Sequence, residues 1–371
     1  MKIGILGGGQ LGRMLIQEAL KYDDEFYTLD PASDAPCHNI SYFTQGNFND
    51  YETVLNFGKD KDVVTIEIEH VNAEALAELE NQGVKVVPNS QIIKTIQQKI
   101  LQKKFYQKHE IPSPEFEVMD GSSDEIKMSL PFVQKMNTGG YDGKGVQVIR
   151  TNEDMKNLWL QDSVLEKLVD IDKELSIIVA KNENGETKAF PVTEMVADPK
   201  LNLLDFNVCP VDDLSEDVEN QINVIASKFL SAVDSPGLFA IELFLDKEGK
   251  VWVNETAPRL HNSGHQSQEG NANSQFEQMY RVVKNFPLAD TDAIVYSGML
   301  NLVGAEGHAG KVIYEGMDEV LKMPETYVHL YGKTETKPGR KMGHINVLAD
   351  SREELMEKLV KVKEMVRVIA E

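Results

Sequence analysis

Residues 132–149 read FVQKMNTGGYDGKGVQVI, and four glycines fall within the seven positions from Gly139 to Gly145, between two apolar segments. This pattern predicts a strand, a glycine-rich loop and a second strand. Such a loop can bring backbone N–H groups within hydrogen-bonding distance of phosphate oxygens, and Lys144 adds a mobile positive charge. We therefore expect a cover over nucleotide phosphates. The alternative is a plain hairpin with a loose turn, which Tyr141, Asp142 and Lys144 disfavour.

Charged residues near this loop extend the interpretation. Lys135 lies in the preceding apolar strand, where a lysine either reaches outward or meets an anion, and beside a phosphate loop we favour a nucleotide. In VLEKLVDIDKELSI, residues 164–177, Glu166 ends an apolar strand and Glu174 follows. A connection between two subdomains can offer backbone groups to an adenine edge and a carboxylate to ribose hydroxyls. Taken alone, the stretch equally suits a solvated loop.

A second group of polar residues lies in a predicted hairpin. GLFAIELFLDKEGKVWVNE reads as two apolar strands around the turn DKEG, with Glu242 inside the first strand and Asn254 and Glu255 ending the second. A buried carboxylate needs a cation or another partner. Two carboxylates and an amide suit Mg²⁺, which prefers hard oxygen ligands and bridges phosphates. The alternative is that both glutamates pair with lysines at a sheet edge.

The segment after the hairpin, APRLHNSGH, concentrates polar side chains without a helix or strand period. Arg259 could bind a carboxylate, a phosphate or carboxyphosphate, and His261 and Asn262 could orient an imidazole or an amine. A zinc site is disfavoured, because no cysteine and no third ligand lie at metal spacing. Further on, LYGKTETKPGRKMGH gathers Lys333, Arg340 and Lys341, which fits a monophosphate site or, in isolation, a solvated loop.

Near the N-terminus, Gly7, Gly9 and Gly12 form the G-x-G-x-x-G pattern of dinucleotide-binding proteins, and Asp30 ends the second strand where a ribose ligand would lie. Strands at KIGIL, EFYTLD, VVTIEIEHV and VKVVPN alternate with helices, the first over 10–22 and another capped by Asn72, which predicts a parallel sheet. Further helices are expected over 90–109, over 215–233 with a Ser cap, and from Arg352 onward. An NAD-dependent oxidoreductase is thus one alternative function.

Bulk properties narrow the class of protein. The 371 residues are too many for one core and indicate two or three domains. A formal charge of −22 argues against a general binder of nucleic acid or acidic membranes, and no apolar run is long enough for a membrane helix. Cys37 and Cys209 form no metal or disulfide framework, which favours a reducing compartment. We expect a cytoplasmic protein with small-molecule substrates.

Together these motifs resemble the ATP-grasp superfamily and, within it, the 5-(carboxyamino)imidazole ribonucleotide synthases. GGGQLGRM, TIEIEHV, GGYDGKG, EK-x-V, VNE-x-APR-x-HNSGH and YGK…GRKMGH occur in order over nearly the whole chain. The resemblance implies a mixed α/β and α+β fold in three parts: a Rossmann-like domain at 1–93, an ATP-grasp domain at 94–286 and a small C-terminal domain at 287–371. It also implies a homodimer.

The resemblance further implies a set of site residues. ATP would contact Lys99, Lys135, Gly139, Gly140, Tyr141, Asp142, Gly143, Lys144, Gly145, Glu166, Lys167, Leu168, Val169, Glu174, Asn254 and Glu255, with Mg²⁺ on Glu242 and Glu255. Aminoimidazole ribonucleotide would contact Gly9, Gln10, Leu11, Glu67, Tyr141, Asp142, Lys144, Arg259, His261, Asn262, Ser263, Lys333 and Arg340, with Gly8 helping to seat its phosphate. Two positions depart from the family pattern, Lys99 for a common Arg and Ala197 for a usual His.

The implied reaction is ATP-dependent carboxylation with bicarbonate through carboxyphosphate. Asp142, Lys144, Arg259 and His261 are the candidate catalytic residues, and either Asp142 or His261 accepts the proton of the substrate amine. The nearest alternative enzyme is the formate-dependent glycinamide ribonucleotide transformylase of the same superfamily. A non-catalytic nucleotide- or carbohydrate-binding module is a third possibility.

Overall fold

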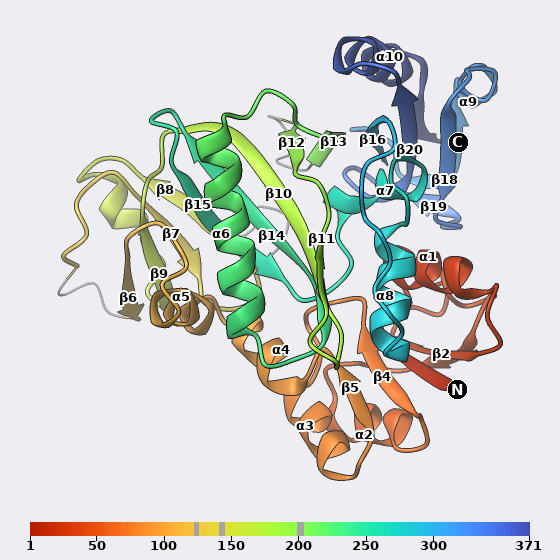
Figure 1. Cartoon of the computed structure of the whole chain (residues 1–371), viewed down its shortest axis with the longest axis horizontal. Helices are drawn as coiled ribbons and strands as arrows, with labels where there is room; N and C mark the ends of the chain where they lie inside the picture. Colours follow the sequence, from red (N-terminus) through yellow and green to blue (C-terminus); the bar gives the residue numbers. More distant parts are fainter. Residues whose placement is uncertain (122–125, 141–144, 199–203) are drawn as a thin grey trace.

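The N-terminal part is a parallel sheet with helices on both faces. The computed structural model describes residues 1–121, 126–140, 145–198 and 204–371 (Figure 1). Strand order is β3-β2-β1-β4-β5, with all pairs parallel. The strands are β1 (Lys2–Leu6), β2 (Glu25–Asp30), β3 (Tyr42–Gln45), β4 (Val63–Ile66) and β5 (Lys85–Val87), and the helices are α1 (Gln10–Ala19), α2 (Tyr51–Gly58) and α3 (Ala73–Asn81). Helix α1 covers one face, and α2 and α3 cover the other. The Asn72 cap of α3 is confirmed.

The expected single helix over 90–109 is wrong. Gln98 has extended backbone (φ −115°, ψ 110°) and separates α4 (Ser90–Gln97) from α5 (Lys99–Lys108). Asn137 stabilises the break, because its backbone oxygen accepts from Lys99 N (2.9 Å) and its side-chain oxygen accepts from Ile100 N (3.0 Å). The new helix start places Lys99 at the site described below.

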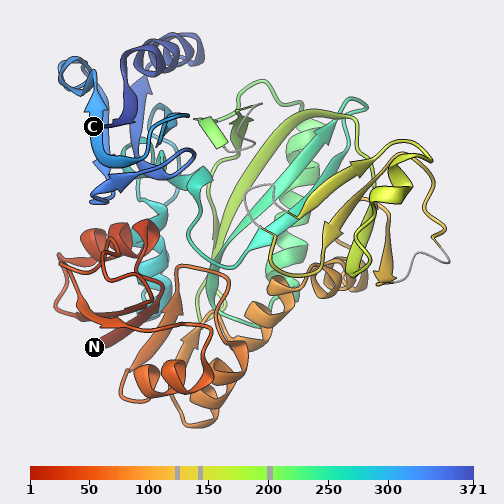
Figure 2. The same ribbon diagram turned by 180° about the vertical axis from the view of Figure 1, so that it is seen from behind.

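The glycine-rich loop connects two strands of a small antiparallel sheet, as predicted. Its order is β6-β9-β7-β8, and the elements are β6 (Phe116–Asp120), β7 (Phe132–Met136), β8 (Val146–Ile149), β9 (Asp162–Lys167) and the short η1 (Asp154–Asn157). This sheet lies at one end of the molecule, and both termini lie at the other (Figures 1 and 2). Residues 141–144, at the tip of the loop, lie outside the described residues.

A nine-stranded antiparallel sheet forms the centre of the molecule. Its order is β15-β14-β10-β12-β13-β16-β20-β18, with β11 beside β10. The strands are β10 (Ile171–Lys181), β11 (Thr187–Ala189), β12 (Thr193–Ala197), β13 (Leu204–Cys209), β14 (Gly237–Asp246), β15 (Val251–Ala257), β16 (Tyr296–Val303), β18 (Thr326–Leu330) and β20 (Lys341–Ala349). Helix α6 (Glu216–Ala232), capped by Ser215 as predicted, packs on one face of β10, β14 and β15. The opposite face is apolar at one end of the strands, where Ile178 and Ala240 are buried, and polar at the other end, where Ser176 and Glu242 lie.

The C-terminal residues divide between this sheet and a smaller one. Strands β16, β20 and β18 belong to it, while β17 (Gly310–Glu315), β19 (Glu335–Thr336) and β21 (Arg367–Ala370) form a three-stranded sheet beside α9 (Met317–Val320) and α10 (Arg352–Met365). The central sheet therefore crosses residue 286, and the domain limits at residues 93 and 286 stay predictions.

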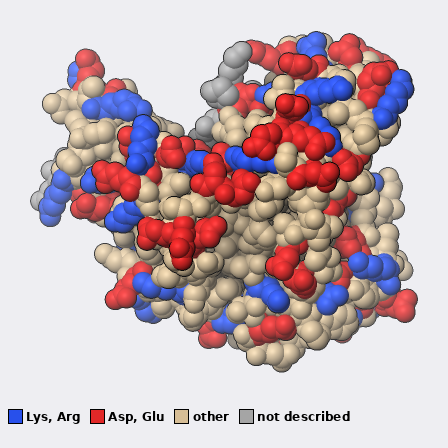
Figure 3. Space-filling model, turned by 45° about the horizontal axis from the view of Figure 1, so that its top comes forward, with Lys and Arg blue, Asp and Glu red and all other residues tan. Residues whose placement is uncertain are grey.

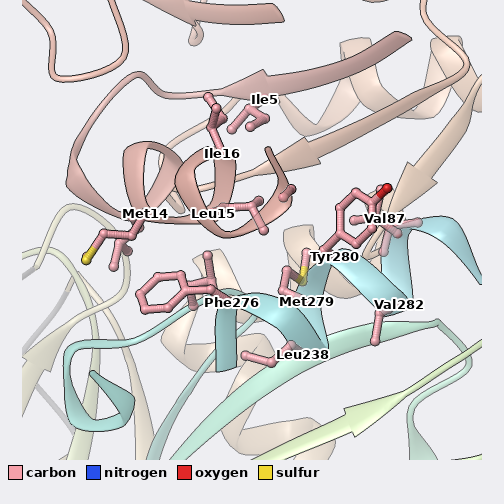
Figure 4. Packing of buried hydrophobic residues seen from close by; sticks show 14 of the residues in the cluster. Ile5, Met14, Leu15, Ile16, Val87, Leu238, Phe276, Met279, Tyr280 and Val282 are labelled. Atoms are coloured by element: carbon pink, nitrogen blue, oxygen red, sulfur yellow. The ribbon is translucent and has the colours of Figure 1, made fainter. Parts of the chain in front are cut away.

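Helix α8 (Gln275–Lys284) joins the N-terminal part to the central sheet. Met14 and Leu15 of α1 pack against Phe276, Met279 and Tyr280 of α8 in one buried cluster (Figure 4). Burial of large apolar side chains stabilises such an interface by about 1.5–3 kcal/mol each. The contact fixes the N-terminal loop relative to the segment 259–265, which precedes α7 (Ser267–Gly270) and α8.

Acidic and basic side chains are interspersed over the described residues of the face in Figure 3, and no continuous basic surface is seen there. No helix among the described residues is both long and apolar enough to cross a bilayer.

Candidate active site

The two hairpin glutamates meet across strands β14 and β15. Glu242 pairs directly with Glu255, and the register shifts between Glu242 and Leu243. Because of this bulge, Asn254 is an extra residue between Val253, which packs into the core, and Glu255. A bulge re-aims side chains, and Asn254 Nδ2 donates to Glu242 Oε2 (3.3 Å). The predicted hairpin and the grouping of its three polar residues are confirmed.

The two carboxyl groups differ in charge environment. Lys99 Nζ forms an ion pair with Glu255 Oε2 and lowers the pKa of Glu255 below its usual value. Burial, and then the charge of Glu255, raise the pKa of Glu242. Among the described residues, Glu242 has no lysine partner, so the edge-pairing alternative holds for Glu255 alone. A further cation here would offset the repulsion between the two carboxyl groups, which suits the predicted metal site.

Buried lysines meet Glu166 next to this pair. Lys135 Nζ donates to Asn254 Oδ1 (2.7 Å) and lies 3.1 Å from Glu166 Oε2. Lys103, which the sequence analysis missed, lies 3.5 Å from the same oxygen. Glu166 is only 3% exposed, so it is not part of a solvated loop. A lysine in an amphipathic helix gives no sequence signal for such a position, because the helix break at Gln98 determines which way it faces.

The other predicted nucleotide residues lie around this group. Lys167 ends β9, Leu168 and Val169 form the connection to β10, and Glu174 lies inside β10, where burial raises its pKa. Glu174 pairs with Phe244, and Ser176 pairs with Glu242, so both residues share the polar face of the sheet with Glu242. Gly139, Gly140 and Gly145 flank the loop tip, whereas Tyr141, Asp142, Gly143 and Lys144 lie outside the described residues.

A chain of polar contacts connects Glu242 to the loop that follows the hairpin. His261 Nε2 lies 3.3 Å from Glu242 Oε1, its Nδ1 lies 2.9 Å from Ser263 Oγ, and Ser263 Oγ lies 2.8 Å from Ser176 Oγ. Ser263 N also donates to His261 Nδ1 (3.4 Å). Burial, and then Arg259, lower the pKa of His261 to about 3. The imidazole is therefore neutral, and because Nδ1 accepts from Ser263 N, its proton is assigned to Nε2, which faces Glu242.

Arg259 and Asn262 complete this loop. Arg259 Nη2 pairs with Glu69 Oε1 (2.7 Å), a partner that the sequence analysis did not identify. Arg259 Nε and Asn262 Nδ2 are buried and have no hydrogen-bond partner among the residues that the structure describes. Buried donors of this kind are normally satisfied, so both mark a place for a ligand.

The first glycine loop differs from the prediction. Glu67 is buried, and its carboxylate accepts from Gly9 N (2.8 Å), Leu11 N (3.1 Å) and Gly12 N (3.0 Å) at the start of α1. Asp30 accepts from Gly8 N (2.8 Å). The amides expected to bind a phosphate are thus already used. The strand expected over 63–71 ends at Ile66, because Glu67 turns to this helix end.

The spacing of these glycines has a steric cause. A Cβ at Gly7 would lie 2.6 Å from Glu67 Cγ, and a Cβ at Gly9 would lie 2.6 Å from Glu67 Oε1. The G-x-G-x-x-G pattern therefore accommodates a protein carboxylate. The Asp30 carboxylate is likewise used within the protein, as the acceptor for Gly8 N. The arrangement therefore opposes dinucleotide binding.

The N-terminal loop and the C-terminal basic segment do meet, as the sequence analysis expected. Lys333 Nζ donates to Gln10 Oε1 (3.2 Å) and to the backbone oxygen of Lys341 (2.7 Å). Burial, and then the charge of Arg340, lower the pKa of Lys333 to about 8. Arg340 Nη1 donates to the backbone oxygen of Glu335 (2.7 Å). This basic group favours an anionic ligand.

The donor set fits Mg²⁺ better than zinc. Glu242, Glu255 and Asn254 supply hard oxygen atoms, and Mg²⁺ completes its shell with water and phosphate oxygens. The described residues include no group of three or more His, Cys, Asp or Glu side chains arranged to hold a metal.

Comparison with known proteins gives one consistent result. The ribonucleotide synthetase preATP-grasp domain family matches residues 1–97, the ATP-grasp domain family 104–276, and the phosphoribosylaminoimidazole carboxylase C-terminal domain family 297–358. An N5-carboxyaminoimidazole ribonucleotide synthase of Aquifex aeolicus is 35% identical, over 98% of this chain and 96% of its own.

Solved structures of similar proteins agree with this. The N5-carboxyaminoimidazole ribonucleotide synthetase of Thermotoga maritima has a TM-score of 0.92 and 38% identity, covering 100% of this chain and 99% of its own. The Aspergillus clavatus synthase, solved with ADP and 5-aminoimidazole ribonucleotide, has a TM-score of 0.88 and 31% identity, covering 98% of each chain.

Proposed function

The chain belongs to the N5-carboxyaminoimidazole ribonucleotide synthase family, and from this membership we propose that it uses ATP to carboxylate 5-aminoimidazole ribonucleotide in purine biosynthesis. The observation that carries the proposal is a continuous set of polar contacts, which runs from Glu166 on the small sheet through Lys135 and Asn254 to Glu242 on the central sheet and His261 beside it. This group lies beside a loop whose buried donors, Arg259 Nε and Asn262 Nδ2, have no hydrogen-bond partner among the described residues, which supports a nucleotide-phosphate site there.

ATP lies in this proposal between the small sheet and the central sheet. Lys99 and Lys135 contact its phosphates, residues 166–169 contact the adenine, Glu174 contacts the ribose, and the glycine-rich loop covers the phosphates. Support comes from the cluster itself, because three lysine ammonium groups gather where, in the described part of the chain, Glu166 and Glu255 are the carboxylates that form ion pairs with them. Such a cluster suits a polyanion.

Mg²⁺ would be held by Glu242 and Glu255, with Asn254 beside them. When bound, it neutralises the charge that develops on phosphate oxygens during transfer. The raised pKa of Glu242 supports this assignment, because the carboxyl group lacks a cation of its own.

The proposed reaction has two steps. A bicarbonate oxygen attacks the γ-phosphorus of ATP, so that ADP leaves and carboxyphosphate forms. The exocyclic amine of the ribonucleotide then takes the carboxyl carbon, directly or as CO₂, and phosphate leaves with the P–O–C oxygen. Arg259, through its unpartnered Nε, holds the carboxyphosphate, and exclusion of water protects this short-lived species.

His261 is better suited to orientation than to proton abstraction. Its Nδ1 accepts from Ser263, its Nε2 carries the proton, and its pKa is about 3. We therefore assign His261 to holding Glu242 and the loop. Asp142, which lies outside the described residues, remains the candidate base of the two.

The ribonucleotide lies near the junction of the N- and C-terminal segments in this proposal. Its phosphate binds Lys333 and Arg340, with Gln10 positioning Lys333. The amides of Gly8, Gly9 and Leu11 contribute only if Asp30 and Glu67 release them, so Gln10 is the loop residue that we assign to the site.

The test is phosphate release from ATP with one component omitted at a time. We expect turnover that requires both bicarbonate and aminoimidazole ribonucleotide. Formate with glycinamide ribonucleotide should give none. Equal turnover without aminoimidazole ribonucleotide would refute the substrate assignment.

Two further properties are proposed from the family resemblance. We place the protein in the cytoplasm and expect a homodimer in solution. Sedimentation at micromolar concentration measures the second property, and a single species at the monomer mass would overturn it.

A further inference from the structure

Lys103 is a buried lysine to which the proposed function assigns no contact with a substrate. It lies in α5 one turn after Lys99, so both side chains project from the same side of the helix. Its exposure is 1%, and its Nζ has no hydrogen-bond partner among the described residues. Burial lowers its pKa to about 8. A buried charge without strong partners is costly, which calls for a reason beyond packing.

The neighbour of Lys103 is a carboxylate that a second lysine also contacts. Glu166 Oε2 lies 3.5 Å from Lys103 Nζ and 3.1 Å from Lys135 Nζ. Lys135 also donates to Asn254 Oδ1, beside the predicted metal ligands. One carboxylate oxygen of Glu166 therefore lies near two ammonium groups. Of the two contacts, only the one with Lys135 has a length typical of a hydrogen bond.

The two lysines differ in what they can reach. Lys135 contacts Asn254, so it already faces the place where ATP phosphates are assigned. Lys103 Nζ lies 5.6 Å from the centre of the ring of Phe116, the first residue of β6. A phosphate that draws Lys135 away would leave Glu166, which is 3% exposed, with Lys103 as its remaining cation.

We propose that Lys103 is a positioning residue that holds the Glu166 carboxylate in place when Lys135 turns to the phosphates of ATP. Lys103 then shortens its contact with Glu166, and the adenine side of the site keeps its shape while the phosphate side rearranges. This inference rests on the proposed nucleotide role of Lys135 and Glu166.

The first experiment compares Lys103→Met with Lys104→Met. Met has similar length and no charge, and Lys104 is the exposed neighbour on the same helix. For Lys103→Met we expect KM for ATP to rise about tenfold, with kcat and KM for the ribonucleotide within twofold of the original. The melting temperature should be unchanged or higher, because an imperfectly paired buried charge has been removed. Lys104→Met should match the unmodified protein.

A packing role would give the opposite pattern. The melting temperature would fall while KM for ATP stayed unchanged, and that result would overturn the proposal. If Lys103→Met does not fold, Lys103→Gln replaces it in the same measurements, because Gln keeps a hydrogen-bond donor near Glu166.

The second experiment is a double-mutant cycle with Glu166→Gln. If Lys103 acts through Glu166, the double variant should have the same KM for ATP as Glu166→Gln alone. Additive increases would show independent roles and contradict the proposal. Absence of turnover by the unmodified protein with ATP, bicarbonate and the ribonucleotide would instead count against the proposed function.

Discussion

Single residues decide the chemistry of this site, and substitution of Glu255 tests its proposed chemistry most directly. It lies between Lys99 and Glu242, so its negative charge serves both the lysine and the proposed metal ion. Gln keeps the shape of the side chain and removes the charge. The fold should tolerate this change, because Glu255 lies on the polar face of the sheet.

Glu255→Gln should lower kcat for ATP turnover by about a hundredfold or more, since loss of a metal ligand removes several kcal/mol of transition-state stabilisation. Its melting temperature should stay close to the original. The control is Glu248→Gln, in the exposed turn of the same hairpin, which should retain full activity. Unchanged turnover in Glu255→Gln would refute its metal role.

Some of the residues at this site could be predicted from the sequence and others could not, for physical reasons. Glu242 and Glu255 were predictable because carboxylates in apolar strands need partners. The contact of Glu67 with the start of α1 was not predictable, since no local pattern shows that its carboxylate caps a helix that starts more than fifty residues earlier. Its assignment to the ribonucleotide stays a prediction. The position of Lys103 could not be predicted, because its burial depends on packing between α5 and β9.

At the scale of elements, local patterns predicted the hairpin, the glycine-rich connection and the capped helices, since turn and cap residues act over a few positions. The break at Gln98 was not predictable, because Asn137 stabilises it from a distant segment. The bulge at Asn254 was also not predictable, since it shifts the register of strands whose inward and outward side chains otherwise alternate regularly.

The fit between the first loop and Glu67 predicts a difference between two glycines. Gly7 and Gly83 both have positive φ, 99° and 88°, but a Cβ at Gly83 meets no atom within 4 Å. Gly83→Ala should therefore cost about 1 kcal/mol of unfolding free energy, and Gly7→Ala about 2–4 kcal/mol, because the new methyl group also displaces Glu67. Denaturant unfolding measures both. Equal losses would show that Glu67 does not constrain the loop.

Three histidines join α7 to strands β18 and β20. His344 stacks on His329 (4.5 Å between ring centres) and meets His265 at a tilt of 40° (4.7 Å). Tyr331 and Glu269 are the other ionisable groups in hydrogen-bond contact with this cluster. Burial lowers the pKa of His265 and His344 well below the usual value. Both rings are therefore neutral in the folded protein.

Because these two pKa values are depressed on folding, the unfolded chain binds more protons below about pH 6.5. Stability should fall as the pH drops through this range, by about 1.4 kcal/mol per pH unit for each histidine. Thermal unfolding at pH 7.5 and 5.5 tests this. His344→Gln should lose less stability than the unmodified protein, whereas exposed His38→Gln should lose as much. An equal loss in all three would contradict the assignment.

At the scale of the whole molecule, the site is assembled from all parts of the chain. The resemblance of the ordered motifs predicts that these segments form one site, and that assignment stays a prediction. Composition could not show how the parts meet. The contact between Gln10 and Lys333, 323 residues apart, exists because α8 holds the N-terminal sheet against the central one.

This assembly predicts separate sites for the two nucleotides. Arg340→Ala should raise KM for the ribonucleotide about 10- to 100-fold, because a charge-assisted contact with phosphate is lost, and leave KM for ATP nearly unchanged. Steady-state kinetics with each substrate varied in turn measures this. A selective rise in KM for ATP would move the basic segment to the other site.

The central claim is that bicarbonate is phosphorylated by ATP and then carboxylates the ribonucleotide. The most direct measurement follows ¹⁸O from labelled bicarbonate during turnover with ATP and aminoimidazole ribonucleotide. The oxygen that attacks the γ-phosphorus stays with phosphate when the C–O bond breaks. We predict one ¹⁸O atom in each phosphate released, together with a carboxylated ribonucleotide. Unlabelled phosphate would contradict the account.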